Sequence, residues 1–229
     1  MTLTADPYCL SDEAAARLLA DAPWRRLAVI GDSVAAGVGD DVPGFPSGGW
    51  AATLARVLSQ GQPDFAYLNL GERDRYAAEV RETQLPGALA FRPDLTFVAA
   101  GGNDLLRRRF DADGMAGEVD AMIGALREQG STVATFAFMD ITRSDIELGD
   151  GAAQLGERLR TYGRVVGEVT RRHGGVQVVM TEHPAAAEAS SYSADRLHLS
   201  ARGHAVVAAE TVRRLAAALP LTDRGAGIG

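Results

Sequence analysis

The sequence predicts an α/β fold, a three-layer α/β/α sandwich built around a parallel sheet. Short, β-branched runs that are apolar almost throughout alternate with amphipathic helical segments from about residue 11 to the end. Runs of this kind are typical of parallel strands that are covered on both faces. Because strand and helix alternate, we expect right-handed crossovers that wind helices over both faces of the sheet.

The first half of the chain is expected to supply three of the strands. Ser11 is a plausible N-cap for the first helix, because its hydroxyl can accept a hydrogen bond from a backbone N–H of the first turn. Pro86 can interrupt the third helix, since proline lacks the N–H that a helix needs. The predicted elements are a helix over 12–22, a strand over 25–31, a helix over 49–61, a strand over 64–70, a helix over 75–90 and a strand over 93–102.

The second half adds a helix over 114–130, a strand over 131–139, a helix over 151–175, a strand over 176–182 and a helix over 200–219. Five strands in this format suit a flavodoxin-like sheet, whose sites lie at the carboxyl ends of the strands, where the crossover direction reverses. No linker or internal repeat interrupts the pattern. We therefore predict a single domain over 1–229, with its core over about 25–219, an N-terminal helical arm over 1–24 and a flexible tail over 220–229.

The composition limits the possible partners and compartments. With 46% hydrophobic and 23% charged residues and a formal net charge of -7, the chain fits a globular protein that does not bind nucleic acid. No stretch approaches the ~20 apolar residues that span a bilayer. The N-terminus also lacks the features of a signal peptide, so a cytoplasmic protein without a membrane partner is expected. Cys9 is the only cysteine, which excludes an intrachain disulfide and a cysteine-based zinc site.

The stretch "GDSVAAGVGD" (31–40) follows the first predicted strand and allows three interpretations. A phosphate-binding P-loop requires a Lys-Ser or Lys-Thr pair that is absent here, and a dinucleotide fingerprint fails because Val42 occupies the third glycine position. The third interpretation presents Ser33 as a nucleophile, near the N-terminus of a helical stretch that favours negative charge on a substrate. Taken alone, the tripeptide is explained as well by a Ser33 helix cap and an Asp32 turn residue.

A histidine and a carboxylate lie between the fifth strand and the last helix, in "SADRLHLSARGH" (193–204). Asp195 and His198 are three residues apart, so the carboxylate can hold the imidazole N–H while the ring takes a proton from Ser33. The simpler alternative makes His198 a polar loop residue and Asp195 a cap. A metal site formed with His204 is conceivable but has no standard ligand spacing, so no metal is predicted.

"FVAAGGNDLL" (97–106) supplies a further polar group, because the third strand ends at two glycines and Asn103 follows at the edge of the sheet. Its amide can donate a hydrogen bond to an oxyanion. An Asx-turn that closes the strand is the alternative. The basic run "LRRRF" (106–110) is expected to be a solvated face, with contact to an anionic substrate as its second interpretation.

Together the order Gly-Asp-Ser, Gly-Gly-Asn-Asp and Asp-x-x-His resembles the SGNH hydrolases, the GDSL-type esterases and lipases, over about residues 25–215. It is most similar to the short bacterial branch of that family. The resemblance implies that Ser33 is the nucleophile, His198 the general base and Asp195 its orienting partner. It also places Asn103, with Gly102 beside it, and the Ser33 N–H in an oxyanion hole.

One block departs from the family pattern. After the second strand the family has Asn-x-x-x-x-Gly, whereas in "NLGERD" (69–74) the glycine position is held by Asp74. Gly71 could serve instead only if the loop were shifted by three residues. A carboxylate pointing at the pocket would oppose an oxyanion by roughly 4 kcal/mol at 4 Å and an effective dielectric of 20. Alternatively, Asp74 points to solvent and hydrolysis survives.

The predicted function is therefore that of a serine esterase or deacylase that acts on a small-molecule ester or an acylated metabolite or sugar through an acyl-enzyme on Ser33. No cofactor is expected. The alternative is an acyltransferase or another non-hydrolytic member of the fold with an altered oxyanion hole. The segment "VPGFPSGGW" (42–50) is a candidate wall of the acyl pocket, with Trp50 taken as a packing residue.

Overall fold

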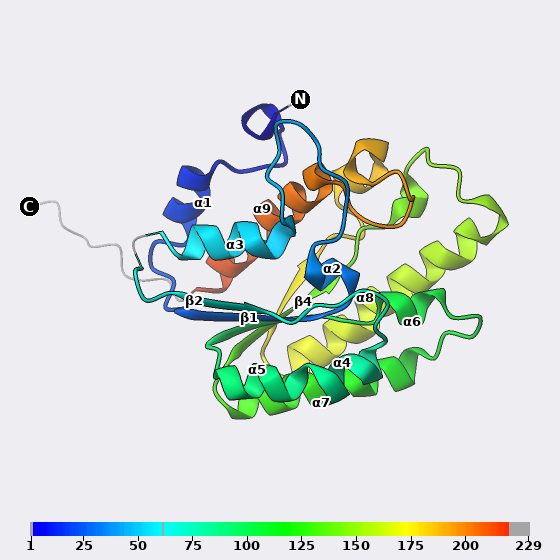
Figure 1. Ribbon diagram of the computed structural model, residues 1–229. Coiled ribbons are helices and arrows are strands. Elements are labelled where there is room, and N and C mark those ends of the chain that lie inside the picture. Colours follow the sequence, from blue (N-terminus) through cyan, green and yellow to red (C-terminus); the bar gives the residue numbers. More distant parts are fainter. Residues whose placement is uncertain (1, 61, 220–229) are drawn as a thin grey trace, which may run out of the picture.

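One parallel sheet lies between two layers of helices (Figure 1). The computed structural model describes residues 2–60 and 62–219, so the predicted flexible tail over 220–229 lies outside the described residues. The strands are β1 (Arg26–Gly31), β2 (Ala66–Asn69), β3 (Leu95–Ala99), β4 (Thr132–Ala137) and β5 (Val176–Val179). Their order is β2-β1-β3-β4-β5, and all neighbours are parallel. The predicted α/β/α sandwich with a flavodoxin-like sheet is confirmed.

The helices are α1 (Asp12–Leu18), α2 (Ser33–Ala36), α3 (Gly49–Leu58), α4 (Ala77–Thr83), α5 (Leu85–Phe91), α6 (Gly102–Leu106), α7 (Ala112–Glu128), α8 (Ala152–Arg172) and α9 (Ala201–Ala218). Short 3₁₀ turns occupy Leu3–Ala5, Ile141–Arg143, Gly149–Gly151, Pro184–Ala187 and Ala189–Ser191. Helices α1, α3 and α9 cover one face of the sheet, and α4, α5, α7 and α8 cover the other (Figure 1). None of these helices combines the length and the apolar character that crossing a bilayer requires.

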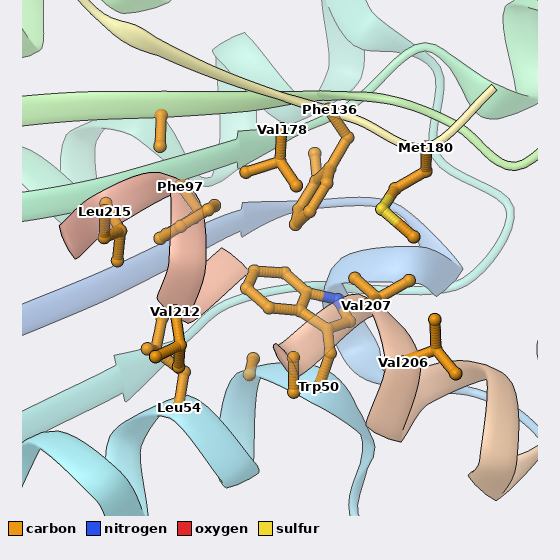
Figure 2. Packing of buried hydrophobic residues seen from close by; sticks show 14 of the residues in the cluster. Trp50, Leu54, Phe97, Phe136, Val178, Met180, Val206, Val207, Val212 and Leu215 are labelled. Carbon is orange, nitrogen blue, oxygen red and sulfur yellow. The ribbon is translucent and has the colours of Figure 1, made fainter. Parts of the chain in front are cut away.

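Trp50 is the centre of the core beneath α3 and α9 (Figure 2). Its ring is fully buried and lies 4.9 Å from the ring of Phe97 and 4.7 Å from that of Phe136, measured between centroids. Its indole Nε1 donates to the carbonyl of Val34 at 2.8 Å. Trp50 is thus a packing residue, as expected, and it also holds α2 against the core.

On the opposite face, Tyr162 of α8 packs against the end of the sheet. Its ring stacks on Phe138 at 4.6 Å, and its hydroxyl donates to the carbonyl of Ala100 at 2.9 Å. Both interactions involve residues just beyond the carboxyl ends of β4 and β3. The two cores therefore fix the backbone at the edge of the sheet where sites are expected in this fold.

The observed elements differ from the predicted ones mainly in where helices end and in the presence of short helices. Ser11 caps α1 as expected, accepting from the N–H of Ala14 at 3.2 Å, but the helix ends at Leu18 instead of residue 22. The segment 75–90 forms two helices that meet at Gln84, with Pro86 in the first turn of α5. Helix α2 begins at Ser33, next to which a helical stretch was expected but given no bounds, and α6 was not predicted, because elements of four and five residues are too short to show a helical period.

Candidate active site

The candidate site lies at the carboxyl ends of β1 and β3, where the strand order changes direction. Gly31, the last residue of β1, pairs with Ala99, the last residue of β3. A Cβ on Gly31 would lie 2.0 Å from the carbonyl oxygen of Ala99, and its φ of +149° also disfavours an L side chain. Glycine is therefore required here if the two strands are to stay paired.

Gln84 holds the same glycine from the other side, and sequence reasoning missed it. Its buried side chain accepts from the N–H of Gly31 at 2.8 Å and donates to the carbonyl of Gly31 at 2.9 Å. A single glutamine inside the predicted helix over 75–90 carries no signal for this contact. It fixes the backbone two residues before Ser33.

Ser33 is the first residue of α2, and Asp32 is its N-cap. The Asp32 carboxylate accepts from the N–H of Val34 at 3.0 Å and from the N–H of Gly102 at 2.9 Å. Burial raises the pKa of this carboxyl group to about 6, against the lowering effect of both hydrogen bonds. Asp32 thus joins the serine turn to the chain after β3, and the N–H of Gly102 is engaged by it.

Asn103 and Asp104, both on α6, hold the loop that connects β2 to α4. The amide nitrogen of Asn103 donates to the carbonyl of Arg75 at 3.0 Å, and the Asp104 carboxylate accepts from the N–H of Ala77 at 2.9 Å. An asparagine amide has two N–H groups, so one remains for a substrate oxygen. The side chain of Asn103 thus makes a contact between loops, in place of the Asx-turn that was its alternative interpretation.

The loop after β2 places Asp74 and Gly71 in different surroundings. Asp74 is exposed and has a left-handed φ of +63°, a conformation that favours glycine and that aspartate tolerates better than most residues. It precedes Arg75, whose carbonyl binds the Asn103 amide. The N–H of Gly71 already donates to the side chain of Asn69 at 2.9 Å, so this group is engaged within the protein.

Gly71 has a different use, close packing against the serine helix. A Cβ there would lie 2.5 Å from the backbone nitrogen of Ala36. The amide nitrogen of Asn69 donates to the carbonyl of Ala35 at 2.8 Å. The loop after β2 is therefore held directly against α2.

His198 and Asp195 form the predicted pair. His198 Nδ1 lies 2.6 Å from Asp195 Oδ2, while Asp195 Oδ1 accepts from the backbone N–H groups of Leu197 and His198, each at 3.0 Å. Burial acts to raise the pKa of Asp195, but the hydrogen bonds from the His198 ring and the two N–H groups outweigh it and lower the pKa to about 2. A carboxylate ionised at neutral pH fixes the imidazole with its proton on Nδ1 and leaves Nε2 as the acceptor.

The loop that carries this pair is locked to the chain after α2 by Asp40, a second residue that sequence reasoning missed. The N–H of Asp40 donates to Ser193 Oγ at 2.8 Å, and its carboxylate accepts from the N–H of Ala194 at 2.8 Å. A Cβ on Gly39 would lie 1.8 Å from the carbonyl oxygen of Leu199. Close contact with the histidine loop is therefore the reason for a glycine at position 39.

Ser33, Asn103 and His198 all line one cavity, together with Asp32, Gly102 and His204. Its volume is about 110 Å³. Apart from the Tyr192 hydroxyl, which donates to the carbonyl of Ala186, the remaining side chains of the lining are apolar. They belong to Val34, Val38, Leu105, Leu106, Phe136, Phe138, Met139, Ile141, Leu155, Leu159, Met180, Tyr192, Leu197, Leu199 and Val207. The predicted wall over 42–50 is absent from this lining, so that expectation was wrong: α8 and α9 contribute to the wall instead.

His204 and His173 are each held by a contact within the fold. His204 of α9 is buried, its Nε2 lies 3.1 Å from the carbonyl oxygen of Val38, and burial lowers its pKa. His173 ends α8, where its Nε2 lies 2.9 Å from Asp120 Oδ1. Within residues 2–60 and 62–219, no group of three or more His, Cys, Asp or Glu side chains is arranged to hold a metal ion.

One family model matches most of the chain, and it decides the family. The model of the GDSL-like lipase/acylhydrolase family matches residues 29–206. The chain belongs to this family. It is accordingly an enzyme of ester hydrolysis, and the matched range includes Ser33, Asn103, Asp195 and His198.

Solved structures of other proteins share the fold of this chain. TesA is 22% identical with a TM-score of 0.67, covering 85% of this chain and 99% of its own. An acetylxylan esterase from Geobacillus stearothermophilus is 19% identical with a TM-score of 0.66, covering 83% and 94%. A lipase/acylhydrolase from Enterococcus faecalis is 21% identical with a TM-score of 0.66, covering 87% and 99%. No curated protein matches the sequence.

Proposed function

We propose that this enzyme is a serine esterase or deacylase that cleaves an ester or acyl group on a small molecule through an acyl-enzyme on Ser33. The observation that carries the proposal is the convergence of Ser33, Asn103 and His198 on one cavity, with His198 held by Asp195 at 2.6 Å. A nucleophile, a base with an orienting carboxylate and an oxyanion donor are the groups that acyl transfer from an ester requires.

In the proposed reaction, Ser33 Oγ attacks the ester carbonyl carbon while His198 Nε2 takes the serine proton. The resulting imidazolium is stabilised by the Asp195 carboxylate. Negative charge on the carbonyl oxygen is stabilised by the free N–H of the Asn103 amide and by the Ser33 N–H, which at the first position of α2 has no partner within the helix. His198 then returns the proton to the departing alcohol.

The second half of the reaction regenerates the enzyme. A water molecule gives a proton to His198 and attacks the acyl carbon, the bond from that carbon to Ser33 Oγ breaks, and the proton returns to Ser33 as the carboxylic acid leaves. If an alcohol or an amine attacked in place of water, the same groups would perform acyl transfer. The feature that favours this second candidate is the departure from the family pattern at Asp74, whose exposed side chain is nevertheless absent from the cavity lining.

The cavity indicates the size and polarity of the acyl group. A cavity of about 150 Å³ lined by apolar side chains accommodates benzene, so the 110 Å³ next to Ser33 suits an apolar acyl chain of roughly four carbons. A longer chain would have to extend toward solvent. We therefore expect short esters to be better substrates than long ones.

The test is turnover of p-nitrophenyl acetate and butyrate by the wild type and by three variants. We expect Ser33→Ala to lose activity by at least about 10³-fold, as removal of a nucleophile does. Ser59→Ala, at the C-cap of α3, is the matched control and should keep full activity. Because Asp74 is exposed and absent from the cavity lining, Asp74→Gly should stay within about threefold of the wild type.

Other outcomes would separate the candidates. Full activity in Ser33→Ala would contradict the acyl-enzyme. An inactive wild type that Asp74→Gly activates would instead favour the acyltransferase alternative. Mass spectrometry of the wild type during butyrate turnover should detect a butyryl adduct on the peptide that contains Ser33.

A further inference from the structure

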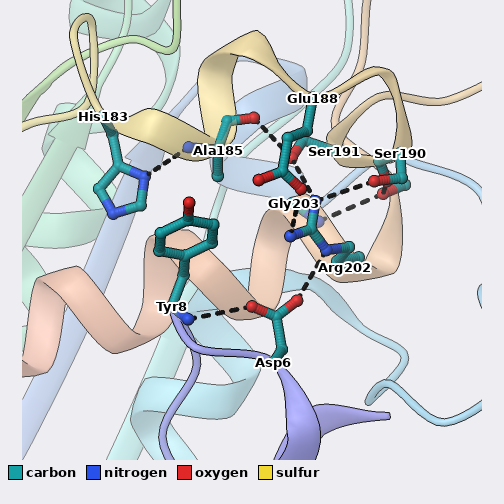
Figure 3. A network of polar contacts seen from close by, with 10 residues as sticks. Asp6, Tyr8, His183, Ala185, Glu188, Ser190, Ser191, Arg202 and Gly203 are labelled. Atoms are coloured by element: carbon teal, nitrogen blue, oxygen red, sulfur yellow. Dashed lines mark hydrogen bonds and ion pairs between the residues drawn. The ribbon is translucent and has the colours of Figure 1, made fainter. Parts of the chain in front are cut away.

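Arg202 is a buried arginine in the first turn of α9, four residues after His198 (Figure 3). Its side chain is 2% exposed. The Nε donates to Asp6 Oδ2 at 2.7 Å, and one terminal nitrogen pairs with Glu188 Oε2 at 2.7 Å. The other terminal nitrogen donates to the hydroxyl oxygens of Ser190 and Ser191, at 2.9 and 3.1 Å.

The residues that Arg202 contacts form the base of the histidine loop. Ser200 joins both serines, because its Oγ donates to the carbonyl of Ser190 at 2.7 Å and its N–H donates to the carbonyl of Ser191 at 3.0 Å. The next residue on each side, Tyr192 and Leu199, form an antiparallel β-bridge. Asp195 and His198 lie in the loop between these two bridge residues. Arg202 therefore fixes the two ends of the loop that carries the pair.

Asp6 comes from a part of the chain that lies outside the family domain. Its carboxylate is fully buried, and its second oxygen accepts from the N–H of Tyr8 at 3.0 Å. Nearby, the N–H of Leu3 donates to the carbonyl of Gly44 at 3.0 Å. The segment over 2–11 is thus attached both to α9 and to the loop that follows the serine helix. From here on, 'the arm' means this segment alone, the first part of the predicted arm over 1–24.

Because Arg202 is charged and buried, its position depends on Asp6 of the arm. A buried guanidinium requires a carboxylate partner with hydrogen bonds in place, because an unpaired buried charge is strongly unfavourable. Glu188, the other partner, is 39% exposed and belongs to the loop that is being held. Asp6 is therefore the fixed, buried charge that keeps the guanidinium in a position where it also binds Ser190 and Ser191.

We propose that the arm positions the catalytic base: Asp6 holds Arg202, and Arg202 fixes the base of the loop that carries Asp195 and His198. This inference rests on the proposed function, in which His198 is the general base. Asp6 and Arg202 are positioning residues that touch no reacting atom, and the arm is a part of the active-site framework that the family domain over 29–206 does not contain.

The test compares Asp6→Asn with Asp12→Asn. Asp12 pairs with Arg56 of α3, so its variant removes an ion pair between the N-terminal segment and the body of the protein without removing a partner of Arg202. We expect Asp6→Asn to lower kcat about tenfold with KM changed less than twofold, since small displacements of a catalytic group are costly. Asp12→Asn should keep the wild-type kcat.

A second variant covers the case in which Asp6→Asn does not fold. Arg202→Lys keeps the charge beside Asp6 but cannot reach all the acceptors of the planar guanidinium, so kcat should fall by severalfold while KM stays near the wild-type value. If either variant, shown by circular dichroism to be folded, kept the wild-type kcat, the inference would be overturned.

A measurement that needs no turnover separates this inference from the proposed function. The proton between His198 Nδ1 and Asp195 gives a low-field NMR resonance when it is protected from water. We expect that resonance in the wild type, its loss through exchange in Asp6→Asn and its retention in Asp12→Asn. An unchanged resonance in Asp6→Asn would contradict the positioning role, even if the wild type proved unable to hydrolyse esters.

Discussion

Asp32, next to the proposed nucleophile, shows how one buried side chain serves both the fold and the site. It caps α2 through Val34 and holds Gly102, the residue before Asn103. The approach is close, because a Cβ on Gly102 would lie 2.9 Å from the Asp32 carboxylate and would force that carboxylate to shift. The distance between the serine turn and the proposed oxyanion donor is therefore determined by one carboxyl group.

The raised pKa of Asp32 predicts a pH dependence of stability. Burial raises the pKa from 3.8 to about 6 in the folded protein, so the folded state binds the proton more tightly than the unfolded state. The resulting contribution to stability is fully present below about pH 4 and is lost as the pH rises through about 6. The shift corresponds to a loss on the order of 3 kcal/mol in the free energy of unfolding.

Urea unfolding of the wild type and of Asp32→Asn between pH 4 and pH 8 would measure this contribution. Asparagine cannot titrate, so the wild type should lose stability relative to the variant as the pH rises across this range. The variant loses one of the two acceptor contacts at every pH, which offsets its curve without changing the slope. Parallel curves for the two proteins would contradict the raised pKa.

At the scale of elements, α6 is a short helix whose two polar side chains organise its neighbours. Asn103 binds the carbonyl of Arg75, and Asp104 accepts from the N–H of Ala77 at the start of α4. Burial raises the pKa of Asp104, opposed by that hydrogen bond. The loop between β2 and α4, with Asp74 in it, is thus positioned by the same helix that carries the proposed oxyanion donor.

We predict that Asp104→Ala lowers both stability and activity. Loss of the contact at the start of α4 should cost about 1 kcal/mol of unfolding free energy, and the freed loop should lower kcat by severalfold. Asp111→Ala is the matched control: Asp111 caps α7 by accepting from the N–H of Gly114 at 3.0 Å and lies outside the cavity lining. It should lose similar stability and keep its kcat. Equal effects of both variants on kcat would argue against a role for α6 in the site.

At the scale of the whole molecule, the cavity exists because several elements converge beyond the sheet edge. Phe136 comes from β4, Met180 follows β5, Leu159 lies on α8 and Val207 lies on α9. None of these residues is near Ser33 in sequence. The proposed preference for short acyl chains is therefore a property of the packing between layers, and the motifs that supply the proposed chemistry do not determine it.

Leu159→Ala should shift the chain-length preference toward longer esters. Removing the side chain enlarges the cavity, so the ratio of kcat/KM for p-nitrophenyl hexanoate to that for the acetate should rise severalfold. Leu126→Ala, a buried leucine of α7 in the same core but outside the cavity, is the control. Both variants should lose about 2–5 kcal/mol of stability, and only the first should change the ratio. A change in both would show that the effect is one of stability alone.

The fold class and the layers could be predicted because buried parallel strands are continuously apolar, and this pattern is local. The predicted strand over 25–31 is observed as β1 over Arg26–Gly31, and the helix over 151–175 as α8 over Ala152–Arg172. The pairing of Asp195 with His198 is local as well, since three residues separate them. The sequence alone thus determined the fold class, the order of the elements and which polar side chains stand at the strand ends.

Only the tertiary structure decided how those side chains are held. Gln84 on Gly31, Asp40 on the histidine loop and Asp6 on Arg202 are contacts between residues 53, 153 or 154, and 196 positions apart. The cavity wall likewise came from α8 and α9 in place of the predicted segment over 42–50. Local propensity and motif spacing do not predict such contacts. The contacts form only when the layers pack, because packing buries polar groups that must then find partners.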